Sequence, residues 1–75
     1  MDAAPTAATW LPSRADFAAL ELSDEDERDV NETMALIVVS VRVGSISPHF
    51  ANWLVSKLAE EKAEACARRI ERERA

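Results

Sequence analysis

The spacing of apolar residues predicts three helices in the 75-residue chain. Apolar residues three and four positions apart share one face of an α-helix, and they predict helices at about 14–21, 24–43 and 48–74. The segment before them, 1–12, is small, polar and bracketed by prolines, which is typical of a flexible arm. We therefore expect an all-α fold, with a flexible N-terminal arm at 1–12 and a single helical domain at 13–75.

Residues at the ends of the predicted helices favour these boundaries. Ser23 precedes a run of acids and suits an N-cap, and Ser47 followed by Pro48 predicts another helix start. Gly44 suits the left-handed position that ends a helix. Ser13 begins a segment with capping-box spacing, which predicts the start of the short helix.

Residues 38–43 leave one alternative open. Four of the six are valine, and β-branched residues in alternation are also typical of a strand. No other segment resembles a strand that would pair with it, so a strand here would need a partner strand from a second chain. The caps on either side favour a helix, and an intermolecular strand remains the alternative.

The middle predicted helix is apolar on two sides. Five apolar residues fall on one side of a helical wheel: Val30, Met34, Ile37, Val38 and Val41. Three more fall nearly opposite: Leu36, Val39 and Val43. A helix that is apolar on two sides has to be covered on two sides. One cover is the last helix of the same chain, and the other is the N-terminal arm or a second molecule.

The short connection at 44–47 predicts that the two long helices form an antiparallel hairpin. Folding there places the acidic stretch 24–29 beside the basic stretch 62–69, which favours this orientation. Pairing of two hairpins into a homodimeric four-helix bundle would cover the second apolar side. The predicted dimer interface consists of Leu36, Val39, Val43, Phe50 and Leu54.

Composition and charge narrow the class of protein. The net charge is −5, and the longest apolar run, 34–39, is far too short to cross a membrane. The N-terminus carries an acid and no basic residue, unlike a signal peptide. We expect a cytoplasmic protein that makes no membrane contact. Abundant alanine and arginine are typical of a GC-rich phage or bacterial genome.

Few residues are suited to catalysis or to metal binding. Cys66 and His49 are the single cysteine and histidine, too few for a protein zinc site or a disulfide within the chain. No glycine-rich phosphate loop or nucleophile–base pattern is present. We therefore expect no enzyme, no catalytic residue, no cofactor and no metal.

Two tryptophans carry the functional hypothesis, because tryptophan is enriched at the energetic centres of interfaces. Trp10 and Leu11 stand out in the arm, and Trp53 lies off the apolar stripe of its helix. We predict that these three residues bind a partner protein. The hypothesis is a small non-enzymatic protein-binding module, a phage or bacterial regulator that inhibits or modulates its partner.

Two other function classes stay open. Arg68, Arg69, Arg72 and Arg74 are suited to phosphate, and the acidic stretch 24–29 is suited to mimicking it, but nucleic-acid binding is disfavoured by the acidic balance of the chain. The second alternative is a purely structural oligomerisation element.

Overall fold

The computed structural model describes residues 9–74, which form three helices: α1 (Ala15–Ala18), α2 (Asp24–Arg42) and α3 (Pro48–Arg74). No strand occurs in this part of the chain, so the all-α prediction is confirmed. The valine-rich residues 38–42 are helical, which resolves the choice between helix and strand within one chain. Residues 1–8 of the predicted arm lie outside the described residues.

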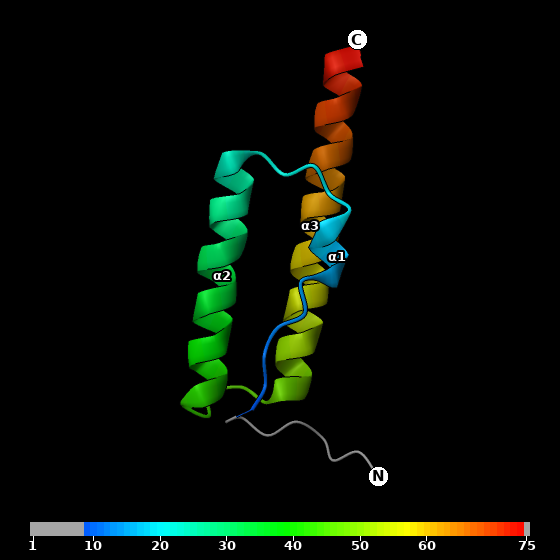
Figure 1. The fold of residues 1–75 in the computed structure, drawn as a ribbon. Helices are drawn as coiled ribbons and strands as arrows, with labels where there is room; N and C mark the ends of the chain where they lie inside the picture. The colour runs from blue at the N-terminus through cyan, green and yellow to red at the C-terminus, as the bar shows by residue number, and fades with distance from the viewer. Residues whose placement is uncertain (1–8, 75) are drawn as a thin grey trace.

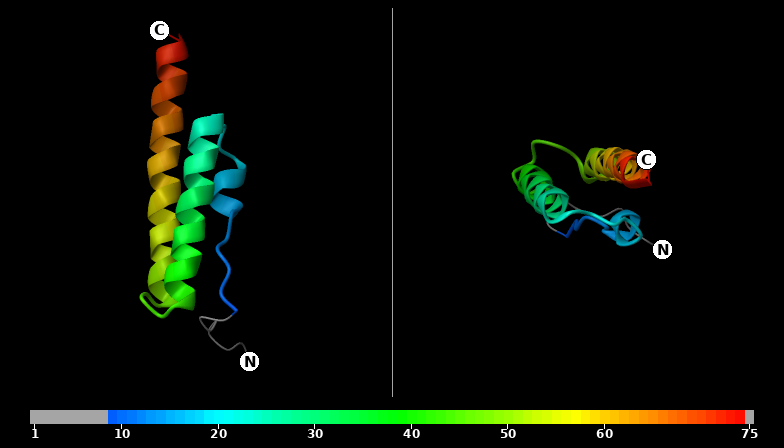
Figure 2. Two further views of the ribbon diagram at one scale, coloured as in Figure 1. Left: turned by 90° about the vertical axis from the view of Figure 1, so that its left-hand side faces the viewer. Right: turned by 90° about the horizontal axis from the view of Figure 1, so that it is seen from above.

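The two long helices lie side by side and run in opposite directions (Figure 1). α3 extends beyond the start of α2, so its last turns project from the pair (Figure 1). The N-terminal segment, residues 9–22, crosses one face of the α2–α3 pair and carries α1 (Figure 2). No described element covers the opposite face, which we call the open face.

The caps around α2 and α3 explain where these helices begin and end. Ser23 Oγ accepts a hydrogen bond from the Asp26 N–H at 3.1 Å, and Ser47 Oγ accepts one from the Phe50 N–H at 3.1 Å. Each bond satisfies a backbone donor that has no partner within its helix. Gly44 follows α2 with φ of +80°, a conformation that glycine adopts without strain.

The first helix is shorter than predicted. It ends at Ala18 rather than about residue 21, and its N-cap is Arg14. The predicted capping box is wrong, because Ser13 Oγ accepts a hydrogen bond from the Ala15 N–H at 3.3 Å rather than from the N–H of residue 16. The chain leaves the helix after Ala18, and further on the carbonyl of Glu21 accepts hydrogen bonds from Arg69 and Cys66 on α3.

The core lies between α2, α3 and the N-terminal segment. The side chains that α2 buries there are those of the predicted inner stripe: Val30, Met34, Ile37 and Val41. Val30 and Val41 are fully buried. On α3 the buried apolar set includes the small residues Ala51 and Ala59, which allow the facing elements to approach closely.

Trp10, for which we predicted a flexible arm and a partner contact, lies in the core. Its side chain is only 2% exposed and belongs to the core of its own chain. The indole Nε1–H donates to Asn52 Oδ1 at 2.8 Å, and the Arg42 guanidinium donates to the Trp10 carbonyl at 3.2 Å. Burying a large aromatic ring with its polar atoms paired is favourable, which explains why this segment is held against α2 and α3.

Candidate functional site

The open face exposes large apolar side chains on α2. Leu36, Val39 and Val43 are 68%, 57% and 69% exposed, although residues of their type are usually buried. They follow one another at spacings of three and four, so they form one ridge along the helix. This ridge lies on the opposite side of α2 from its buried stripe.

The facing part of α3 adds an aromatic cluster. Phe50 is 46% exposed and Trp53 is 52% exposed, and their rings stack with centroids 5.6 Å apart and planes 18° apart. The Lys57 ammonium lies 5.5 Å from the centroid of the Trp53 ring, which is cation–π geometry. The sequence signal for this cluster, which we did not use, is the i, i+3 and i, i+4 spacing of the three residues.

The two sets belong to the same side of the molecule. Arg14 binds Asn31 on α2, which marks the covered side of this helix, and at 100° per residue Leu36 lies about 140° away from Asn31. Asn52, which binds Trp10, marks the covered side of α3, and Phe50 lies about 160° away from it. Leu36 and Phe50 therefore point away from the N-terminal segment. Val39 and Trp53 lie at the two outer edges, where Trp53 and Lys57 also line a pocket with Asp16 of α1.

The predicted interface and partner residues are not equally accessible. Leu54 is only partly exposed because it also packs against the core. Leu11 is 72% exposed, whereas its neighbour Trp10 is buried. The accessible members of the predicted sets are therefore the five residues of the open face (Leu36, Val39, Val43, Phe50 and Trp53), together with Leu11.

Beyond this apolar part, Lys62 joins the two long helices. Its Nζ donates to Asp29 Oδ2 at 2.7 Å and to Asp26 Oδ1 at 3.2 Å. Lys62 is 7% exposed and is the one buried charged residue in the described part of the chain. The hydrogen bond to Asp29 raises the pKa of Lys62 despite burial, and the hydrogen bond from Lys62 lowers the pKa of Asp26. The sequence places these groups near one another, but it did not reveal that Lys62 is buried.

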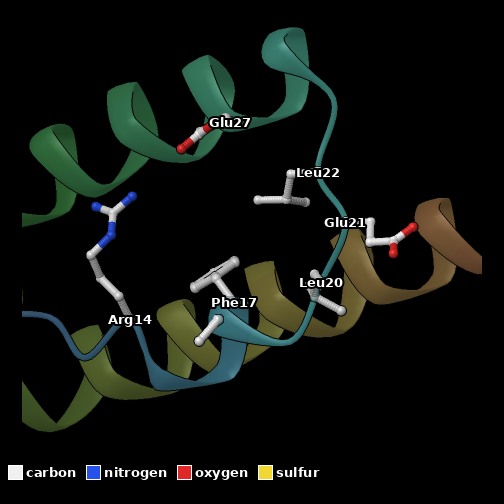
Figure 3. Close-up of a pocket in the computed structure, with 7 residues that line it drawn as sticks. Arg14, Phe17, Leu20, Glu21, Leu22 and Glu27 are labelled. Carbon is white, nitrogen blue, oxygen red and sulfur yellow. The ribbon is translucent and has the colours of Figure 1, made fainter.

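A pocket of about 430 Å³ opens where α1 leads into α2 (Figure 3). Phe17, Leu20 and Leu22 provide its apolar lining, and Arg14 reaches from the start of α1 toward α2. Arg14 is already hydrogen-bonded to Asn31. The pocket is on the covered side of the molecule, and the carboxylates of Glu21 and Glu27 also line it.

Other features of residues 9–74 bear on function class. No group of three or more His, Cys, Asp or Glu side chains within this range is placed to hold a metal ion. No helix of the same range is both long and apolar enough to span a membrane. Cys66 is buried, with its Sγ 3.5 Å from the carbonyl oxygen of Glu21.

Comparisons of the chain with protein-family models, curated proteins and solved structures found no match. The function therefore has to be inferred from the surface of the molecule itself.

Proposed function

We propose that this chain is a non-enzymatic protein-binding module that regulates a partner protein by binding it through the open face. The observation that carries the proposal is the group of five large apolar side chains, each 46–69% exposed, on one side of an otherwise well-packed helix pair. Exposed apolar clusters of this kind, rimmed by charged residues, mark interaction sites in soluble proteins.

The aromatic cluster makes the open face suited to specific binding. Trp53 offers a large ring that stacks with Phe50 and has the Lys57 ammonium over its face. A side chain that is already held loses little conformational freedom when a partner covers it. Tryptophan is also among the residue types most enriched at energetic centres of interfaces.

The proposal includes the homodimer that the sequence predicts. In it, the α2–α3 pair acts as an antiparallel hairpin, and two hairpins associate as a homodimeric four-helix bundle. Small chains often gain stability from such association because a single small core contributes little. Regulation then follows from which molecule occupies the open face.

A capture experiment with matched variants tests the proposal. Tagged wild-type protein, Trp53→Ala and Ile70→Ala are incubated with a lysate of the source organism, and captured proteins are quantified by mass spectrometry. Ile70 is the control because it is 37% exposed on the same helix but lies near the end of α3 at Arg74, far along the helix from Trp53. We expect a discrete partner that wild type and Ile70→Ala retain and that Trp53→Ala loses by about 30-fold, the effect of truncating an interface hot spot.

Capture of the same partner by Trp53→Ala at wild-type level would contradict the proposal. Helical content of each variant, measured by circular dichroism, separates loss of binding from loss of folding.

A further inference from the structure

On the open face, residues of α2 and α3 at the same level along the helix axes have the same character, apolar near Gly44 and charged toward the other end. The ion pair between Lys62 and Asp29 sets the register, so positions whose numbers add up to about 90 lie at one level of the antiparallel pair. Val39 is thus level with Trp53, and Leu36 is level with Leu54. Both helices are apolar at the end near Gly44 and charged toward the other end.

We infer that a second copy of this chain covers the open face, related to the first by a two-fold axis parallel to the helices. In this arrangement α2 of each chain packs antiparallel to the partner's α3, and the four long helices form a bundle. The inference rests on the proposed function, since it names the occupant of the same face. The N-terminal segment stays on the outside of the bundle, because it covers the opposite side of each α2–α3 pair (Figure 2).

The apolar residues match in this arrangement. A rotation about an axis parallel to the helices keeps every residue at its own level, so the outer edge of α2 meets the outer edge of the partner's α3. Val39 then faces the partner's Trp53. Leu36 and Val43 face inward, toward the partner's Leu54 and the partner's Phe50. All five exposed residues of the open face leave water together.

The charged residues match as well, and they distinguish a second copy from an arbitrary apolar partner. Lys57 pairs with Glu60 in its own chain, at 3.1 Å. In the dimer, Arg28 comes level with the partner's Glu64, and Glu32 comes within two positions of the level of the partner's Lys57. All four of these residues are exposed in the single chain. Each pair has opposite charges, which favours this register over a shifted one.

A third pair extends the pattern to the far end. Glu25, in the first turn of α2, comes within two positions of the level of the partner's Arg68, and both residues are exposed in the single chain. The projecting end of α3 thereby lies beside the acidic start of the partner's α2, where the helix dipoles also favour the pairing.

A two-fold axis perpendicular to the helices would also give a symmetric dimer, but it would pair fewer of the exposed residues than the parallel axis does. With the two-fold axis perpendicular to the helices, α2 would pack on the partner's α2, centred on Val39. The apolar ridge of α2 would then be covered, but the two chains would overlap only at their ends near Gly44. Arg28 would lie far from the partner's Glu64, and the charge complementarity would have no role.

Charge reversal tests the inference through the dimer dissociation constant, measured by sedimentation equilibrium over a hundredfold range of concentration. Wild type is expected to sediment at twice 8.3 kDa. Arg28→Glu and Glu64→Arg are each expected to raise the dissociation constant about five- to tenfold, and the double variant is expected to recover to within about twofold of wild type. Val39→Asp is expected to raise it at least about a hundredfold, because it places a carboxylate against the partner's Trp53.

Disulfide trapping gives a second, independent measurement. Tagged Val39→Cys mixed with untagged Trp53→Cys is expected to form the mixed disulfide in preference to either self-linked dimer. Cys66 stays in place because it is buried, and wild type serves as the control for it.

Three results would overturn the inference: a wild-type monomer throughout the concentration range, a double reversal as weak as its parents, or preferential self-linking of Val39→Cys. A wild-type monomer would also remove the homodimer from the proposed function. The protein-binding role itself fails only if Trp53→Ala still captures the partner protein.

Discussion

The two faces of the α2–α3 pair are both apolar, but only one of them is covered by the described residues, 9–74. The covered face receives the N-terminal segment, and directional polar bonds fix that segment in place. Asn52 and Arg42 bind the side chain and the carbonyl of Trp10, and Arg69 binds the carbonyl of Glu21. The open face exposes Leu36 and Val43, and no described segment of the chain covers them.

This difference shows that an apolar surface needs directional polar bonds at its border if a segment or a partner is to bind it in one position. Apolar burial is non-directional, so it supplies energy without fixing position. Buried hydrogen bonds and charges supply the position, because leaving them unpaired is costly. On the covered face these groups are within the chain, and on the open face the complementary charges are offered to another molecule.

The largest expected effect comes from introducing the same charge on either side of α2. Val41 is fully buried and Val39 is 57% exposed, although only two positions separate them. Val41→Asp is expected to lower the free energy of unfolding by more than about 4 kcal/mol, because it buries an unpaired carboxylate. Val39→Asp is expected to keep the helical signal in circular dichroism while dissociating the dimer.

Urea unfolding, monitored by circular dichroism at low protein concentration, compares the two variants. An equally severe loss of monomer stability in both would mean that the outer side of α2 belongs to the core. Equal tolerance of both would mean that α2 is not buried where the structure places it.

The next largest effect is on the free energy of unfolding when Trp10, which holds the N-terminal segment on the covered face, is truncated. Trp10→Ala is expected to cost about 3–5 kcal/mol, the range for removing a large buried aromatic side chain. Leu11→Ala is the matched control, because its side chain is 72% exposed, and it is expected to change stability by less than about 0.5 kcal/mol. Thermal melts of both variants test the comparison, and equal midpoints would show that the N-terminal segment does not contribute to the core.

The contrast between Trp10 and Gly44 shows how far the sequence predicts the fold. The helix boundaries at Ser23, Gly44 and Ser47 depend on bonds to residues within a few positions, so local pattern is sufficient to find them. Trp10 is buried by contacts 32 and 42 positions away, with Arg42 and Asn52. Proline and alanine around it are typical of a linker, and no local pattern reveals the distant partners.

The candidate site was predictable to a similar degree. The wheel places Leu36, Val39 and Val43 opposite the inner stripe, and the structure leaves all three exposed. The burial of Lys62 could not be predicted from its own helix, because it depends on how Asp26 and Asp29 are presented by α2. Charged residues near one another in a hairpin usually remain solvated.

The smallest expected effect is a pH dependence at the charged end of the pair. Asp26 has a lowered pKa in the folded chain, first because Lys62 donates a hydrogen bond to it and then because of Ser23. A carboxyl with a lowered folded pKa stabilises the fold above its unfolded pKa, near 3.8, and loses that contribution as the pH falls through the folded value. Lys62 has a raised pKa, so its contribution is present below its unfolded value of 10.5 and is lost as the pH rises through the folded value.

Asp26→Asn should therefore melt below wild type at neutral pH. The gap between the two midpoints should close as the pH falls below 3.8 and through the folded pKa of Asp26, where wild type also loses the charge of Asp26. Asp24→Asn is the control, because it removes a charge from the same helical turn, at an exposed residue that forms no ion pair with Lys62. Thermal melts at pH values from about 7 to 2.5 compare the three proteins. A gap between Asp26→Asn and wild type that stays constant down to the lowest pH would mean that Asp26 acts through its shape rather than its charge. The Lys62 cluster would then hold the two helices in register through Asp29 alone.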